Sequence, residues 1–376
     1  MAVSLPSAPE GEDRMTSFTT VQTAAMQRAL RAAASPDAPP GPNPRVGCVI
    51  LSPDGDILAE GHHRGAGSAH AEVDALTNLV AAGASARGTT AVVNLEPCNH
   101  QGRTGPCVQA LLDAGVAEVI YAQDDPTEQA GGGATALEAA GVRVRRGLCA
   151  QEAARLNRPW LLAVTRGRPM VTWKLAATLD GRIAAADGTS QWITPVAARH
   201  DAHRLRRQCD AIMVGTGTAL ADDPALTVRD EAGQPAPAHL QPLRVVVGSR
   251  SLPPTSRVLA DDHYLLLPEH DPHAVLAVLA ERGIRHVLLE GGPTLATAFL
   301  RAGLVDQVVA YTAPALLGAG AAALADFGAA TISDALRLRR PRVEVLGAGD
   351  ELAVRFCGDL QADDVPTAHF HTEESH

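Results

Sequence analysis

Apolar residues recur at helical spacing near the start of the chain, in segment 21–34. The Pro-Pro-Gly-Pro-Asn-Pro run at 39–44 ends that predicted helix, because proline lacks the amide hydrogen that a helix interior needs. Segments 45–51 and 56–62 then predict two strands around a tight Ser-Pro-Asp-Gly turn. The first ordered part of the chain is therefore expected to be a helix followed by a β-hairpin.

Strands and helices alternate in the next stretch. Helical spacing after Ala71 predicts a helix, and the continuous apolar run 89–95 predicts a buried strand. A second helix is expected to open at Pro106 and to end at Gly115, since proline suits a first helical turn and glycine suits a C-terminal cap. This alternation predicts an α/β domain with a mostly parallel sheet and helices on its faces. The remaining predicted elements are a strand over 116–122, a helix over 134–140 and a short strand over 142–145.

A new pattern begins after an Ala-rich helical stretch and an Arg-Gly-Arg-Pro sequence, which together predict a domain boundary. Beyond it the apolar pattern is again that of an α/β domain. Strands are expected over 170–175, 211–214, 243–247, 286–289 and 305–311, with a helix over 293–301. The predicted organisation is a disordered tail (1–17), a first domain (18–148), a linker (149–168), a second domain (169–360) and a second disordered tail (361–376).

Composition supports this picture and excludes several classes of protein. A length of 376 residues exceeds one ordinary core and favours two domains. The formal net charge of −10 argues against a general nucleic-acid binder, whose affinity depends largely on Lys and Arg neutralising phosphates. Six cysteines are too few for a disulfide scaffold, the first residues lack the apolar core of a signal peptide, and no apolar run could span a bilayer. We expect a cytoplasmic protein with reduced thiols and without membrane or nucleic-acid partners.

The residues that most strongly indicate a metal site are His70, Cys98 and Cys107. One imidazole and two thiolates form a donor set that suits zinc, and three protein ligands leave a fourth position for water, as in catalytic zinc sites. Glu72 follows His70 at the predicted start of a helix. A free cysteine is more often a small buried residue, and the other four cysteines fit that alternative. The polar, Gly- and Pro-containing loop between Cys98 and Cys107 favours ligation.

A His-x-Glu sequence followed by Pro-Cys is typical of zinc deaminases, in which zinc activates a water and the glutamate moves protons. Two residues separate the cysteines in cytidine and tRNA adenosine deaminases, whereas eight separate Cys98 from Cys107 here. The longer loop therefore predicts a different substrate. We expect His100, Arg103 and Thr104 of this loop to contact that substrate.

The segment 43–49, Asn-Pro-Arg-Val-Gly-Cys-Val, adds a third motif. Asn43 precedes a predicted strand, where its amide either faces a ligand or only shapes the turn. Together with the His-Ala-Glu and Cys-containing motifs, this segment closely resembles the deaminase half of the bifunctional riboflavin-biosynthesis deaminase/reductase family. The resemblance implies a cytidine-deaminase-like α/β/α domain. The chain departs from the family pattern at Gly105, where proline is typical, and at 127–128, where Thr-Glu replaces the frequent Asn-Pro.

Two stretches of the second half place polar groups after predicted strands. The Gly291-Gly292 turn follows a buried strand and opens a helix, which would present bare backbone amides to the phosphates of a nucleotide. It is not the Gly-x-Gly-x-x-Gly fingerprint, and by itself such a turn more often has no further role. The stretch 214–229 contains hydroxyls, carboxylates and one arginine that could contact a ligand. The alternative is a loop with no further role.

Four motifs of the second half, at 174–182, 190–194, 222–224 and 290–292, resemble the reductase half of the same family and occur in the same order. The resemblance covers about 19–358 and implies a dihydrofolate-reductase-like α/β domain that uses NADPH. The motifs leave the roles of Lys174 and Asp180 undefined. The implied NADPH contacts are Ala176, Trp192, Thr218, Asp222, Ser249, Gly292, Pro293 and Thr294. The implied substrate contacts are Ser190, Arg206, Leu226, Arg229 and Glu290.

The two arginines of that substrate set suit a phosphate monoester, which a planar guanidinium binds bidentately, although solvated surface arginines are common. The resulting hypothesis is a homo-oligomeric enzyme that acts on a phosphoribosylated diaminopyrimidinone. It would remove ammonia hydrolytically with zinc and Glu72, and would then reduce the ribosyl group to ribityl with NADPH. Two alternatives are a nucleic-acid deaminase with an accessory domain and a zinc-stabilised binding protein without catalysis. The acidic charge disfavours the first alternative, and the intact Glu72 disfavours the second.

Overall fold

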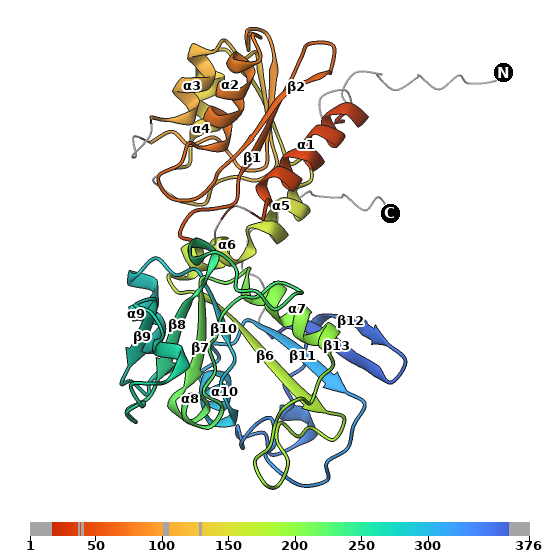
Figure 1. The fold of residues 1–376 in the computed structure, drawn as a ribbon. Coiled ribbons are helices and arrows are strands. Elements are labelled where there is room, and N and C mark those ends of the chain that lie inside the picture. The colour runs from red at the N-terminus through yellow and green to blue at the C-terminus, as the bar shows by residue number, and fades with distance from the viewer. Residues whose placement is uncertain (1–16, 37, 39–40, 101–104, 128–129, 361–376) are drawn as a thin grey trace, which may run out of the picture. The chain divides into compact units, whose positions relative to one another are not determined.

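The computed structural model describes residues 17–36, 38, 41–100, 105–127 and 130–360. The described residues form two compact units, one from the segments up to residue 38 and between 45 and 156, and the other from residues 41–44 and 157–360 (Figure 1). The predicted substrate contacts Arg103 and Thr104 lie outside the described residues, as do the predicted tails except Ser17.

The first unit is built on a five-stranded sheet, which begins with the predicted β-hairpin. Its strands β1 and β2 pair antiparallel, β1 also pairs antiparallel with β3, and the β3–β4 and β4–β5 pairings are parallel. The expectation of a mostly parallel sheet was therefore wrong here, because the hairpin makes one side of the sheet antiparallel. In sheet order the strands are β2 (Ile57–His62), β1 (Gly47–Leu51), β3 (Thr90–Val93), β4 (Glu118–Tyr121) and β5 (Arg143–Arg146).

Helices cover both faces of this sheet and give the expected three-layer α/β/α arrangement (Figure 1). On one face α2, α3 and α4 enclose a core, and on the other face α1 packs against the sheet. A Cβ atom at Gly47 would lie 2.1 Å from the carbonyl oxygen of Ala29, so only glycine lets α1 approach β1 this closely. The helices are α1 (Thr20–Ala33), α2 (Ala71–Ala81), α3 (Cys107–Asp113), α4 (Gly133–Ala139) and α5 (Ala150–Leu156).

The second unit contains an eight-stranded sheet that is parallel from β11 to β9 and ends in the antiparallel strands β13 and β12. The sequence pattern predicted five of these strands but missed β9, β12 and β13. β12 alternates charged and apolar residues and is exposed along almost its whole length, so it lacks the apolar run by which the other strands were found. In sheet order the strands are β12 (Arg339–Ala348), β13 (Glu351–Asp359), β11 (Gln307–Ala313), β6 (Met170–Thr178), β10 (His286–Leu289), β7 (Ala211–Gly215), β8 (Leu243–Val247) and β9 (Tyr264–Leu267).

Helices lie on both faces of the second sheet as well. The helices α9 and α10 bury one core against it, and α7 and α8 bury another. The stretch predicted as a linker, 149–168, folds into α5 and α6, and α6 buries Trp160, Leu161 and Leu162 within the second unit. No described helix is long and apolar enough to cross a membrane. The helices are α6 (Arg158–Arg166), α7 (Val196–Arg206), α8 (Thr216–Asp222), α9 (Pro272–Glu281) and α10 (Pro293–Arg301), with short 3-10 turns at Ala238–Leu240, Arg257–Leu259 and Ile332–Asp334.

The carboxylate of Asp306 holds the start of β6 in place. Its side chain is 1% exposed and accepts hydrogen bonds from Arg166 at 2.6 Å and from two guanidinium nitrogens of Arg168 at 2.8 Å. It also accepts one from the backbone N–H of Val171 at 2.8 Å. A charge so deeply buried requires all of these partners, and removing one side of such a pair leaves the other charge uncompensated.

We predict that Asp306→Asn lowers the free energy of unfolding of the second unit by about 3–5 kcal/mol, because two partly buried arginines lose their anion. All three tryptophans of the chain lie in this unit, so urea unfolding followed by tryptophan fluorescence measures the effect. The control is Glu231→Gln, which removes an ion pair with a 79%-exposed carboxylate and should cost less than about 1 kcal/mol. Equal effects of the two substitutions would contradict the role given to Asp306.

Candidate functional sites

His70, Cys98 and Cys107 meet at one end of the first sheet. His70 is the N-cap of α2, Cys107 is the first residue of α3, and Cys98 lies in the loop after β3. The Nδ1 atom of His70 is 3.2 Å from Sγ of Cys107 and 3.4 Å from Sγ of Cys98, and all three ligand atoms lie within 4.8 Å of one another. Ligands at zinc bond lengths around a tetrahedral centre are roughly 3.6 Å apart. The three side chains therefore fit a zinc ion in both chemistry and spacing.

The electrostatics of the cluster favour a thiolate. Hydrogen bonds from the Cys107 thiol and from His70, together with the Cys107 backbone N–H at 3.5 Å, lower the pKa of Cys98 to about 4. Cys107 and His70 each form a hydrogen bond with Cys98. These hydrogen bonds raise the pKa of Cys107 and the pKa of His70. The cluster therefore favours the thiolate form of Cys98, which is the form that binds metal.

Glu72 lies in the first turn of α2 and its residue is 3% exposed. Burial raises the pKa of its carboxyl group, while its own backbone N–H and the Cys107 thiol oppose that rise. A buried carboxyl group of raised pKa beside a metal cluster is suited to taking up and releasing protons.

The loop that carries Cys98 is held by contacts that sequence reasoning did not single out. The carboxylate of Glu96 accepts hydrogen bonds from the backbone N–H groups of Asp125 at 3.2 Å and Ala134 at 2.9 Å. A Cβ atom at Gly133 would lie 1.8 Å from the carbonyl oxygen of Pro97, so the first turn of α4 packs in direct contact with this loop. Glu96 belongs to the motif that carries Cys98, but its two partners follow 29 and 38 residues later, and no local pattern identifies them.

Of the substrate contacts predicted for this site, the structure describes Asn43 and His100. His100 is partly buried, and its Nδ1 atom is buried without a hydrogen-bond partner among the described residues. Asn43 is exposed and belongs to the segment 39–44, which groups with the second unit. His63, which was not predicted, lies edge-on to His70 with ring centroids 5.6 Å apart, and burial lowers its pKa.

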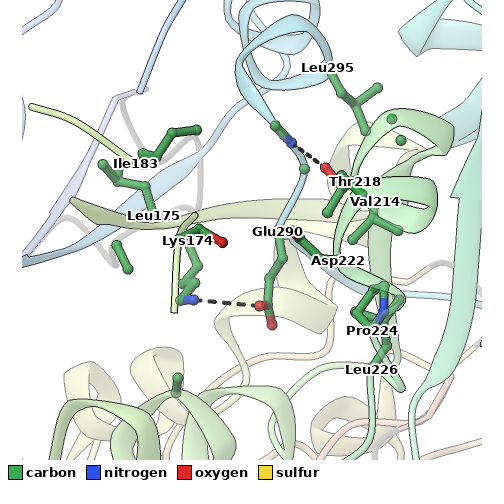
Figure 2. A pocket seen from close by; sticks show the side chains of 18 of the residues that line it. Lys174, Leu175, Ile183, Val214, Thr218, Asp222, Pro224, Leu226, Glu290 and Leu295 are labelled. Atoms are coloured by element: carbon green, nitrogen blue, oxygen red, sulfur yellow. Dashed lines mark hydrogen bonds and ion pairs between the residues drawn. The ribbon is translucent and has the colours of Figure 1, made fainter. Parts of the chain in front are cut away.

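A cavity of about 1330 Å³ opens in the second unit at the carboxyl ends of β7, β8 and β10 (Figure 2). Ligands of open α/β sheets gather at such strand ends. Every predicted cofactor contact, from Ala176 to Thr294, lines this cavity, and so does every substrate contact predicted for the second half of the chain, from Ser190 to Glu290. The fold therefore assembles residues that are more than 100 positions apart in the sequence.

Glu290 is the polar centre of the cavity. Its carboxylate accepts two hydrogen bonds from Arg206, at 2.7 and 3.0 Å, and Nζ of Lys174 lies 3.5 Å away (Figure 2). Burial opposes ionisation, but Arg206 and Lys174 hold the pKa of Glu290 at about 2. The guanidinium of Arg206 is thus directed at Glu290 and, through its remaining Nη1 atom, at the carbonyl of Thr227 at 3.0 Å.

The sequence motifs left the role of Lys174 undefined, although the composition of the chain singles this residue out. It is the only lysine in a chain whose other basic side chains are arginine or histidine. A lysine ammonium is compact and titratable where an arginine guanidinium is planar and permanently charged, so a position that retains lysine in such a chain is a candidate for proton transfer. By contrast, Asp180 does not line the cavity: it accepts a hydrogen bond from the backbone N–H of Gly318 at 2.7 Å and anchors that loop.

The turn before α10 offers a site for phosphate groups. The Gly292 N–H donates to Oγ1 of Thr218 at 3.0 Å, which joins the turn to α8 (Figure 2). The helix begins at Pro293, and backbone N–H groups at a helix N-terminus favour anions. Near the cavity entrance the ring of Trp192, a residue that is 70% exposed, lies 4.5 Å from the Arg199 guanidinium. Together with the cavity volume, these groups fit a dinucleotide cofactor.

Comparisons with known proteins agree with both sites. Residues 19–123 match the cytidine and deoxycytidylate deaminase zinc-binding region, and residues 169–349 match the RibD C-terminal domain. Riboflavin biosynthesis protein RibD of Mycobacterium tuberculosis is 52% identical over 308 residues, which cover 81% of this chain and 89% of the relative. The structure of Acinetobacter baumannii RibD superposes with a TM-score of 0.80 at 36% identity and covers 91% of this chain and 99% of that chain.

A second solved structure is a diaminohydroxyphosphoribosylaminopyrimidine deaminase/5-amino-6-(5-phosphoribosylamino)uracil reductase from Thermotoga maritima. It has a TM-score of 0.78 and 29% identity and covers 90% of this chain and 99% of that chain. The fold expected for each half is confirmed. The chain belongs to the RibD family, the bifunctional deaminase/reductases of riboflavin biosynthesis, with a zinc-dependent deaminase domain and an NADPH-dependent reductase domain.

Proposed function

We propose that the substrate of the first site is the phosphoribosylated diaminopyrimidinone named for the Thermotoga maritima relative, and that the second site reduces its deaminated product. The observation that carries the proposal is the presence in one chain of the His70, Cys98 and Cys107 cluster and of the cavity around Glu290. Incubation with this ribotide followed by mass spectrometry tests it. A gain of one mass unit should occur without NADPH, because oxygen replaces NH, and a further gain of two mass units should require NADPH.

In the deaminase domain, His70, Cys98 and Cys107 would hold zinc. When bound, zinc would lower the pKa of a water ligand towards about 7. Glu72 would take the proton from that water and pass it to the pyrimidine ring and the leaving ammonia, a role that fits its burial in the first turn of α2. We propose that Asn43, His100, Arg103 and Thr104 contact the substrate.

Glu72→Gln should lower the rate of ammonia release by about 10²–10⁴-fold or more, because the amide of glutamine cannot take up the proton. Zinc content and NADPH oxidation with deaminated product should stay at wild-type levels, since the ligands and the second unit are unchanged. Ammonia assay and metal analysis measure these quantities. The matched control is Glu138→Gln at an exposed position of α4, which should leave both activities intact. An active Glu72→Gln enzyme would refute the assignment.

In the reductase domain, we propose that the eight predicted cofactor residues bind NADPH, which supplies the hydride. The substrate would be contacted by Ser190, Arg206, Leu226, Arg229 and Glu290. Arg206 would also orient the carboxylate of Glu290. Lys174 points at Glu290 on the floor of the same cavity. We propose that its ammonium, held by that ion pair, donates the proton that accompanies reduction of the opened sugar. His203 contributes a neutral imidazole, because burial and Arg206 lower its pKa to about 4.

Lys174→Met and Lys174→Arg should both lower NADPH oxidation by about 10²-fold or more, because neither side chain delivers a proton at neutral pH. Ammonia release serves as the internal control and should be unaffected. Steady-state NADPH oxidation with supplied deaminated product gives the reductase rate. A fully active Lys174→Arg enzyme would show that position 174 needs only a positive charge.

The domain assignment, the location and the oligomeric state are further parts of the proposal. The deaminase activity is assigned to 18–148 and the reductase activity to 169–360. The six free cysteines support a reducing, cytoplasmic location, and the net charge of −10 supports a small-molecule substrate in preference to nucleic acid. We also propose that the enzyme is a homo-oligomer, and sedimentation of the full chain tests this.

A further inference from the structure

Five of the described arginines line the cavity of the second unit, and three of them already bind acceptors of the protein. Arg199, Arg206 and Arg229 donate to such acceptors at 3.1, 2.7 and 2.8 Å. The other two are Arg250 and Arg257. Among the residues that the structure describes, the terminal guanidinium nitrogens of these two contact no carboxylate and no other acceptor. Two cations of the cavity wall are therefore available to a ligand.

Arg250 is placed by the turn that follows β8. Gly248 has a φ of +121°, and a Cβ atom there would lie 2.8 Å from Oγ1 of Thr216, so the turn requires glycine. Nε of Arg250 donates to the same hydroxyl oxygen at 3.4 Å. Its Nη2 atom would lie 2.9 Å from a Cβ atom at Gly217, so the guanidinium packs against the backbone of α8. The group is thus held at the cavity wall while its terminal N–H groups stay unoccupied.

This position is near the turn that offers a site for phosphate groups. Gly292 of that turn binds Thr218 of α8 and follows the end of β10 (Figure 2). Only β7 separates β10 from β8 in the sheet, so the carboxyl ends of β10 and β8 are about 10 Å apart. The adenosine ribose of a dinucleotide is joined directly to its pyrophosphate and can reach the end of β8. That ribose carries the 2′-phosphate by which NADPH differs from NADH.

The charges at the end of β8 suit a phosphate. Many NAD-binding sheets present an Asp or Glu to the ribose 2′-hydroxyl, whereas an arginine accommodates a 2′-phosphate. No acidic residue follows β8 before Asp261. Glu269 also lines the cavity, but its carboxylate accepts hydrogen bonds from the backbone N–H groups of His270 at 2.7 Å and Asp271 at 3.0 Å. Ser249, a proposed cofactor contact, adds a hydroxyl next to the guanidinium.

We propose that Arg250 binds the 2′-phosphate of NADPH and gives the second site its preference for NADPH over NADH. Its guanidinium forms charge-assisted hydrogen bonds to phosphate oxygens, and the uncharged ribose hydroxyl of NADH offers no equivalent. The inference rests on the proposed NADPH contacts. It adds a residue that none of the sequence motifs assigned, and a reason for discrimination between the two dinucleotides.

The first test is isothermal titration calorimetry of the full chain with NADPH and with NADH. Arg250→Ala should raise the Kd of NADPH by about 10–100-fold and change the Kd of NADH by less than about threefold, because only NADPH loses a charge-assisted contact. Arg257→Ala should affect NADPH less than Arg250→Ala does. The matched control is Arg282→Ala, at an exposed position directly after α9 that does not line the cavity, and it should leave both affinities unchanged.

Several results would overturn the inference. Equal losses of NADPH and NADH affinity in Arg250→Ala would show that the side chain supports the cavity and does not read the phosphate. An unchanged NADPH affinity, or a larger loss with Arg257→Ala, would place the phosphate elsewhere. A wild type that binds NADH as tightly as NADPH would overturn the inference and leave the proposed cofactor contacts standing, whereas a wild type that binds neither would overturn both.

The second test uses fragments of the cofactor and does not depend on the nicotinamide. Adenosine 2′,5′-bisphosphate should displace NADPH from the wild type at concentrations at least about tenfold lower than adenosine 5′-monophosphate, since the two differ only in the 2′-phosphate. The two fragments should compete equally well for Arg250→Ala. Arg250→Glu should bind the bisphosphate more weakly still, because its carboxylate would face the phosphate. Equal competition by the two fragments for the wild type would contradict the assignment.

Discussion

Buried carboxylates need several hydrogen-bond donors each, and this requirement fixes the backbone around both sites. Glu96 joins the loop that carries Cys98 to two later segments of the first unit. In the second unit Asp306 ties the start of β6 to two arginines, and Glu290 joins β6 to α7 at the cavity. Each of these anions would be costly if its partners were absent. The loops and strands near the chemistry are therefore held by charge as well as by apolar packing.

The metal cluster shows how close packing supports the chemistry. His70 and Cys107 are placed by helix starts, which are rigid, whereas Cys98 lies in a loop and depends on its neighbours. The backbone of α4 at Gly133 packs so closely against Pro97 of that loop that there is no room for a side chain. A ligand set with distances of 3.2 and 3.4 Å between its atoms can form only where the backbone is held this firmly.

The cavity of the second unit combines permanent and titratable charges. Arg206 neutralises the buried Glu290 without taking part in proton exchange, because a guanidinium stays protonated. Nζ of Lys174 lies 3.5 Å from the same carboxylate. The proton-donor role proposed for Lys174 would account for the single lysine in a chain whose other basic side chains are arginine or histidine.

The sequence by itself predicted many of the element types, the zinc donor set and the family, because these depend on local periodicity and on motifs whose residues are close in the chain. The helix at 293–301 and the hairpin around 52–55 appear as predicted. The tertiary structure alone revealed that the ends of distant strands converge on one cavity, that Arg206 binds Glu290 and that Glu96 organises the Cys98 loop. It also revealed the strand β12, whose alternating pattern was not recognised because no apolar run marks it. These features depend on contacts between residues far apart in the chain, which local patterns do not encode.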